Sequence, residues 1–155
     1  MANRTTPPQL RRLEPTELAW ANERYAEVDF LPSPATDLVA VALVGGTPAA
    51  LGRVTRLTEA SGELGGMYVF PEFRGLGVAS RMIDYLVSEC GLKLLFCLPF
   101  EHLHDMYTAA GFAVQPPDET VPQKVRDKHV WCNAHYPERV LLMSRGRDST
   151  GPGNV

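Results

Sequence analysis

Short apolar runs separated by turn-forming residues dominate the first half of the chain. The most continuous run, Asp37–Val44, ends at Gly45-Gly46 and predicts a buried strand followed by a hairpin turn. Its partner strand is expected over Ala50–Leu57, and a further strand over Met67–Phe70. With another short strand expected at Leu10–Leu13, successive strands joined by short turns indicate an antiparallel meander.

Helical periodicity marks two longer segments. One begins at Pro15 and repeats apolar side chains at Leu18, Ala21, Tyr25 and Val28. The second runs from about Gly75 to Cys90, with Val78, Met82, Leu86 and Cys90 four residues apart. The remaining elements expected are strands at Leu92–Leu98, Phe112–Val114 and Val140–Ser144, and a short helix at Phe100–Ala110. This order predicts an α/β (α+β) fold with a mixed, mostly antiparallel central sheet flanked by helices and one right-handed parallel crossover.

Two irregular segments and two termini complete the predicted organisation. Residues 29–37 are expected to form a loop, with room for one helical turn, beside any site at the strand ends. Residues 115–139, rich in proline at their start, are expected to form a long excursion that is ordered in part. Residues 1–8 are expected to be a flexible arm and residues 146–155 a disordered tail. A single domain is therefore predicted over residues 9–145.

Composition narrows the class of protein. The 155 residues are 45% hydrophobic and 21% charged with a net charge of −3, which is typical of a globular domain and gives no electrostatic support for binding nucleic acid. No run of eighteen apolar residues is present, so no membrane partner is expected. Three widely spaced cysteines without an apolar leader indicate reduced thiols and a cytoplasmic protein.

The stretch from Arg74 to Ala79 carries the clearest chemistry. Its two glycines follow a predicted strand and open a predicted helix, so unpaired N–H groups at a positive helix end could bind phosphate or pyrophosphate. The stretch lacks the G-K-[ST] of a nucleotide-binding P-loop. It also follows an antiparallel meander, which argues against a dinucleotide fingerprint.

Two motifs together resemble the Gcn5-related N-acetyltransferase (GNAT) family. Arg74, Gly77 and Ala79 match the family's turn signature, and Tyr107 with Gly111-Phe112 matches its Y-x-x-x-G-F motif. The resemblance covers about residues 63–114. It implies a GNAT fold of six to seven strands that splays between strands 4 and 5, with a bulge at Gly65-Gly66 helping to open it. It also implies an acyl-CoA, usually acetyl-CoA, as co-substrate.

The resemblance assigns roles to individual residues. The pyrophosphate would be held by backbone N–H groups of Arg74, Gly75, Leu76, Gly77, Val78 and Ala79. Met67 and Val69 would pair with the pantetheine arm, and the N–H of Tyr68 or Met67 would stabilise the oxyanion. Tyr107 is the expected general acid, against the alternative of a core tyrosine. Glu63 is the expected base, acting through water, against the alternatives of a solvent-exposed glutamate and a water chain without a single base.

Other polar residues offer weaker alternatives. His129 is a second candidate base, and Cys97 a conceivable acyl carrier, although a buried thiol is favoured. Arg53 and Arg56 would contact an acidic acceptor or phosphates, or be solvated. Trp131 and Tyr136 would line the acceptor pocket or pack the excursion. The spacing of His129, Cys132 and His135 is not a usual zinc pattern, so no metal is expected.

These expectations define an N-acetyltransferase that moves an acetyl group from acetyl-CoA to a small-molecule or peptide amine by direct attack. The alternative is a non-catalytic acyl-CoA sensor on the same fold. Residues 15–37 and 115–139 are expected to determine the acceptor. A homodimer, common in the family, stays open.

Overall fold

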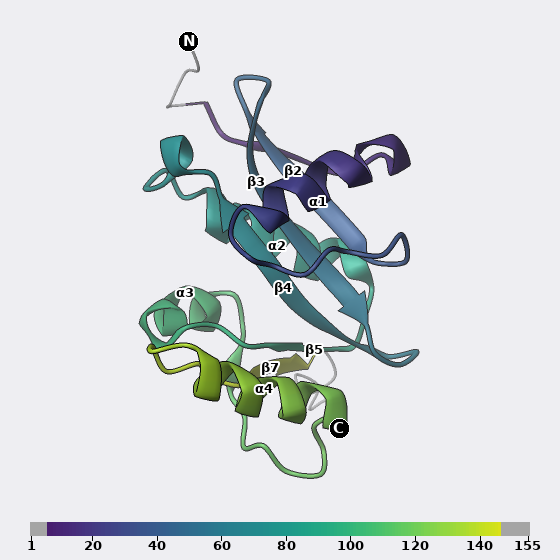
Figure 1. Cartoon of the computed structure of the whole chain (residues 1–155), viewed down its shortest axis with the longest axis vertical. Helices are drawn as coiled ribbons and strands as arrows, with labels where there is room; N and C mark the ends of the chain where they lie inside the picture. The colour runs from purple at the N-terminus through teal and green to yellow at the C-terminus, as the bar shows by residue number, and fades with distance from the viewer. Residues whose placement is uncertain (1–5, 147–155) are drawn as a thin grey trace. The chain divides into compact units, whose positions relative to one another are not determined.

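The structure is a computed structural model that describes residues 6–146. Its strands are β1 (Gln9–Arg12), β2 (Leu38–Val44), β3 (Thr47–Arg56), β4 (Ser61–Val69), β5 (Leu94–Cys97), β6 (Ala113–Val114) and β7 (Met143–Gly146). Its α-helices are α1 (Leu18–Ala26), α2 (Val78–Cys90), α3 (His104–Ala109) and α4 (Gln123–His135), and single 3-10 turns at Pro15–Glu17, Pro71–Phe73 and Glu101–Leu103 precede the first three (Figure 1). Residues 1–5 and 147–155, which hold most of the predicted arm and tail, lie outside the described residues.

The strands form one mixed sheet in the order β1-β2-β3-β4-β5-β7-β6. Its pairings are mostly antiparallel, and β4 and β5 are the parallel pair, joined through α2. The predicted fold class is therefore confirmed. Strand β7 enters between β5 and β6, an order that the hydrophobic pattern did not reveal.

The described chain divides into two compact units. Unit 1 contains residues 6–55 and 64–90, and unit 2 contains residues 56–63 and 91–146. Strand β4 contributes to both, because Ser61–Glu63 belong to unit 2 and Leu64–Val69 to unit 1. The assignment of residues 9–145 to a single domain remains a prediction.

Unit 1 has a helix on each face of its strands (Figure 1). On one face, α1 buries Ala21 and Tyr25 against apolar residues of β2, β3 and β4. On the other, α2 lies so close to β3 that a Cβ on Gly52 would be 2.8 Å from Met82 Cγ and 2.9 Å from Leu86 Cδ1. Gly52 is thus the close contact that its position in a strand predicted.

Unit 2 places α4 across β5 and β7 (Figure 1). Val125 of α4 packs with Phe96 of β5 and with Leu142, just before β7. The helix is the ordered part of the excursion expected over residues 115–139, although its helical character was not predicted. Only Val125 and Cys132 of the thirteen residues of α4 are buried, so the sequence has no apolar stripe from which this helix could be predicted.

Several element boundaries also differ from those predicted. Helix α2 begins at Val78 rather than Gly75, because Gly75 and Gly77 adopt left-handed backbone conformations outside the helix. Strand β4 begins at Ser61, well before Met67. Strand β7 begins at Met143, and Val140 makes only an isolated bridge to Phe100. None of the helices among residues 6–146 has the length and apolar character of a membrane-spanning segment.

Candidate functional site

The stretch of residues 74–79, termed here the glycine turn, links the 3-10 turn after β4 to α2. Gly75 and Gly77 have φ angles of 79° and 77°, which residues with a Cβ adopt only at a cost. A Cβ at either position would meet no atom within 4 Å, so open space lies beside both. Within the described chain, the N–H groups of Gly75, Leu76 and Gly77 make no hydrogen bond. Free N–H groups before a thirteen-residue helix suit a phosphate group, so the glycine turn fits the pyrophosphate of an acyl-CoA.

Gly66 of strand β4 has an unusual backbone conformation, just before the residues expected to bind the pantetheine arm. Gly66 has a φ of 58°, the left-handed conformation found at a bulge that begins with glycine. Its carbonyl accepts a hydrogen bond of 2.7 Å from the hydroxyl of Tyr25. We call this feature the Gly66 kink and the three following residues, Met67–Val69, the donor edge. The bulge expected at Gly65-Gly66 stays a prediction.

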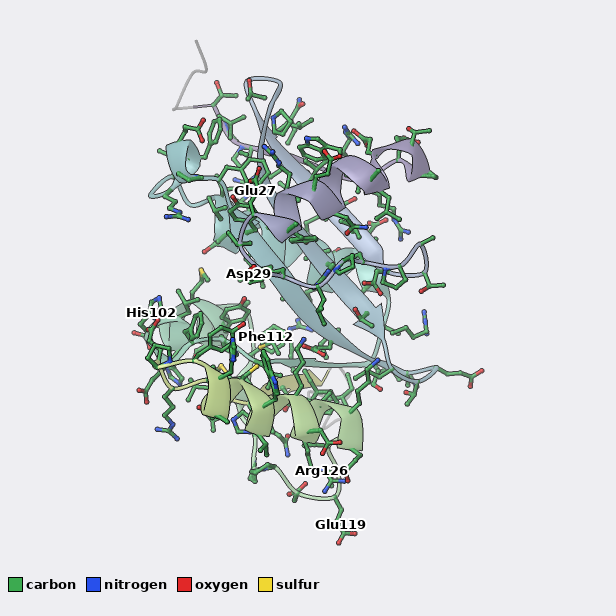
Figure 2. The ribbon with its side chains drawn as sticks, in the orientation of Figure 1. Glu27, Asp29, His102, Phe112, Glu119 and Arg126 are labelled. Carbon is green, nitrogen blue, oxygen red and sulfur yellow. The ribbon has the colours of Figure 1, made fainter. Side chains whose placement is uncertain are left out.

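The side chain of Tyr68 points toward α1, so its hydroxyl is not assigned a role in acyl chemistry. It is buried with Tyr25 and Val39, and its hydroxyl donates to Glu27 Oε1 at 3.2 Å. Burial, reinforced by that carboxylate, raises the pKa of Tyr68. Glu27 lies just after α1 and Asp29 in the loop that follows (Figure 2). Tyr68 therefore contributes its backbone to the donor edge while its side chain anchors α1.

Tyr107 lies in α3 of unit 2 and is 4% exposed. Its ring packs edge to face on Phe112, with centroids 5.8 Å apart, so the two aromatic residues of the Y-x-x-x-G-F motif are in contact. Burial, with a further effect from Cys97, raises the pKa of Tyr107 well above that of a free phenol. No hydrogen bond from the described residues reaches its hydroxyl. The phenol thus stays protonated and keeps its donor for another group.

Glu63 is not the solvent-exposed glutamate of the alternative interpretation. It is 9% exposed, and its Oε2 accepts a 2.6 Å hydrogen bond from Lys128 Nζ of α4. Lys128 is itself 48% exposed, so the pair lies at the edge of the buried region. This contact could not be predicted from the sequence, because the partners are 65 residues apart and α4 lacks an apolar stripe. Its other carboxylate oxygen, Oε1, accepts no hydrogen bond from the described residues.

The remaining candidates have other contacts. His129 Nε2 donates to the carbonyl of Val140 at 2.9 Å, so that nitrogen is already used. Burial and the charge of Glu63 raise the pKa of the Cys97 thiol well above its usual value, which opposes thiolate chemistry. Arg53 and Arg56 are not simply solvated, since both donate to backbone carbonyls.

The residues of the excursion pack on one another. Trp131, 54% exposed, stacks on His135 at 4.4 Å and meets Tyr136 edge to face. These rings therefore pack on one another at the end of α4, and the roles expected for Trp131 and Tyr136, at the acceptor pocket or in packing the excursion on the sheet, stay predictions. Among residues 6–146, no three His, Cys, Asp or Glu side chains are grouped as metal ligands.

The predicted site residues fall into two groups. The donor edge and the glycine turn belong to unit 1, and Glu63 and Tyr107 belong to unit 2. Within unit 1, the Arg74 side chain folds back, its Nε donating to the carbonyl of Val69 at 3.4 Å. Two contacts were not predicted from the sequence. Tyr25 forms a hydrogen bond with the Gly66 kink, and Lys128 forms one with Glu63.

Comparison with known proteins identifies the family. The model of the acetyltransferase (GNAT) family matches residues 6–112, and the chain belongs to this family. No curated protein sequence matches the chain.

Solved structures show the same fold. Rv2747 from Mycobacterium tuberculosis, solved in complex with CoA, has a TM-score of 0.69 at 16% identity, with 90% of this chain and 99% of that chain covered. The ribosomal-protein-S18-alanine N-acetyltransferase from Escherichia coli has a TM-score of 0.62 at 16% identity, over 90% and 94% of the two chains. N-acetylglutamate synthase from Neisseria gonorrhoeae, complexed with coenzyme A and L-arginine, has a TM-score of 0.66 at 15% identity. The match covers 90% of this chain but 33% of that synthase, so this chain spans about a third of its length.

Proposed function

We propose that the protein is an N-acetyltransferase that uses acetyl-CoA to acetylate an amine. The proposal rests above all on the glycine turn, whose two left-handed glycines and unpaired N–H groups precede a long helix. Membership of the GNAT acetyltransferase family and the CoA-bound structures that share its fold support the same donor.

Each part of unit 1 has a distinct task in holding the donor. Acetyl-CoA supplies the acyl thioester. The backbone N–H groups of Arg74 to Ala79 bind its pyrophosphate, and Met67 and Val69 hydrogen-bond its pantetheine arm as an added strand would. The N–H of Tyr68 or Met67 faces the carbonyl oxygen on which negative charge develops.

Tyr107 is proposed as the general acid for the departing sulfur. Its raised pKa means that the phenol carries its proton at every pH at which the protein would act. An ordinary thiol has a pKa of about 8.5, so full proton transfer from tyrosine to a solvated thiolate would be uphill. Burial raises the pKa of a thiol as well, as the Cys97 thiol in the same unit illustrates, and this brings the two acidities closer.

Glu63 is proposed as the base that receives the acceptor's proton through water. The carboxylate is held by one strong hydrogen bond, and its second oxygen, Oε1, has no hydrogen bond among the described residues. That oxygen could accept from a water molecule without breaking the contact to Lys128. The acceptor class proposed is a small-molecule or peptide amine.

A thiol-release assay tests the function and separates it from a sensor. The protein is mixed with acetyl-CoA and a panel of polyamines, amino acids, aminoglycosides and peptide N-termini, and free CoA thiol is followed. Release that depends on one acceptor class is expected. Donor binding in calorimetry, with no release above the acceptor-free rate for any amine, would favour the sensor instead.

A further inference from the structure

The buried side chain of Tyr25 links α1 directly to the Gly66 kink. Tyr25 is fully buried, and its hydroxyl donates to the Gly66 carbonyl at 2.7 Å across 41 residues of sequence. The donor edge starts at the next residue, Met67. The direction in which the donor edge leaves the kink therefore depends on this hydrogen bond.

Arg53 of β3 connects the same kink to the loop of residues 27–37. Its guanidinium lies over the Tyr25 ring, 4.6 Å from the centroid. One of its nitrogens, Nη1, donates to the carbonyl of Leu31 at 2.8 Å and to Ser33 Oγ at 2.7 Å. A single side chain thus contacts the ring that holds the kink and two positions of the loop.

The loop end of this connection is itself fixed. Ser33 is buried, its N–H donates to Asn22 Oδ1 at 2.8 Å, and its carbonyl accepts from Asn22 Nδ2 at 3.1 Å. Asn22 and Tyr25 are one helical turn apart on α1, so the loop is held on the same helix as the kink.

Space at the kink is fully used. A Cβ on Gly66 would lie 2.6 Å from Arg53 Nε and 2.8 Å from the Tyr25 hydroxyl. Packing this tight means that the kink cannot shift without moving Arg53 or Tyr25. A displacement of Arg53 is in turn transmitted to Leu31 and Ser33, with which it forms hydrogen bonds.

We infer that Tyr25 and Arg53 are positioning residues that couple the donor edge to the loop of residues 27–37. Binding of CoA to the donor edge should therefore also stabilise the backbone of residues 29–37. This inference rests on the proposed function, in which the donor edge binds CoA.

Amide hydrogen exchange with CoA as the ligand tests the coupling without any turnover. In the wild-type chain, CoA should slow exchange in peptides covering residues 64–70 and also in those covering 29–37, the latter by about fivefold or more. In Arg53→Met, CoA should still protect residues 64–70, but the protection of residues 29–37 should be lost.

Arg56→Met is the matched control. Arg56 lies on the same strand, but the only groups among residues 6–146 to which its guanidinium donates are the carbonyls of Thr58 and Glu59. This variant should retain both protected regions. Tyr25→Phe, which keeps the ring and removes the hydroxyl, should weaken CoA binding about tenfold as well as uncoupling the loop.

The outcomes separate this inference from the function on which it rests. CoA binding that leaves exchange of residues 29–37 unchanged in the wild-type chain would overturn the coupling alone. Full loop protection in Arg53→Met would also overturn it. Absence of CoA binding to the wild-type chain would overturn both proposals.

Discussion

The Gly66 kink is the part of the donor site most sensitive to a single methyl group. In Gly66→Ala, a residue with a Cβ must adopt a φ of 58°, which costs about 1–2 kcal/mol. The new methyl group would also lie 2.6 Å from Arg53 Nε and 2.8 Å from the Tyr25 hydroxyl, and overpacking of this kind typically costs about 1–3 kcal/mol. The free energy of unfolding should therefore fall by about 2–5 kcal/mol.

Urea denaturation measures this loss, with Gly46→Ala as the matched control. Gly46 has a φ of 81°, but a Cβ there would meet no atom within 4 Å, so only the backbone cost of about 1–2 kcal/mol applies. For a slope of about 2 kcal/mol per molar urea, the midpoint of Gly66→Ala should fall by roughly 1–2.5 M and that of Gly46→Ala by less than about 1 M.

Equal midpoints for the two alanine variants would refute the packing argument. They would show that Arg53 and Tyr25 move aside at little cost, and that the kink is not held by its surroundings. A second readout follows from the same geometry, because Gly66→Ala should also weaken CoA binding, whereas Gly46→Ala should leave it unchanged.

Three further outcomes are expected. Tyr107→Phe should lower kcat about 100-fold with donor affinity unchanged. Because burial raises the pKa of Tyr107, the wild-type rate should show no alkaline decline from this residue up to about pH 10. A decline near pH 10 that Tyr107→Phe abolishes would refute this reasoning. Gly77→Ala should weaken CoA binding about tenfold in calorimetry. Gly91→Ala, with a similar φ of 68° and equally open surroundings, should only lower the midpoint of urea unfolding. Equal CoA affinities of the two variants would exclude the glycine turn as the CoA-binding site. Glu63→Gln should lower kcat/KM about 100-fold, whereas Lys128→Met should retain activity. Loss of Lys128 should lower the free energy of unfolding by about 1 kcal/mol. Full activity of Glu63→Gln would show that Glu63 is not the base.

Local patterns in the sequence were sufficient for most of the fold. The apolar run of β2 and the four-residue spacing of Val78, Met82 and Leu86 predicted a buried strand and α2, and both are present with those residues buried. The start of α2 was misplaced because glycines at 75 and 77 fit either a helix or a left-handed turn. Helix α4 was not predicted because its sequence lacks a periodic apolar face, and contacts with other elements hold it in place.

Contacts between distant residues account for what the sequence could not provide at the site. The motifs marked the glycine turn and Tyr107, since each lies within a short segment. The partner of Glu63 is 65 residues away, and that of the Gly66 carbonyl is 41 residues away. Such pairs depend on the packing of whole helices and strands, so they cannot be predicted from the spacing of residues in the sequence.

Calorimetric titration of the wild-type chain with acetyl-CoA tests the central claim most directly. The account predicts saturable binding at one site per chain, which Gly77→Ala weakens and Gly91→Ala does not. Absence of saturable binding, or binding to which both variants respond equally, would contradict the assignment of the glycine turn as the site that holds the acyl donor.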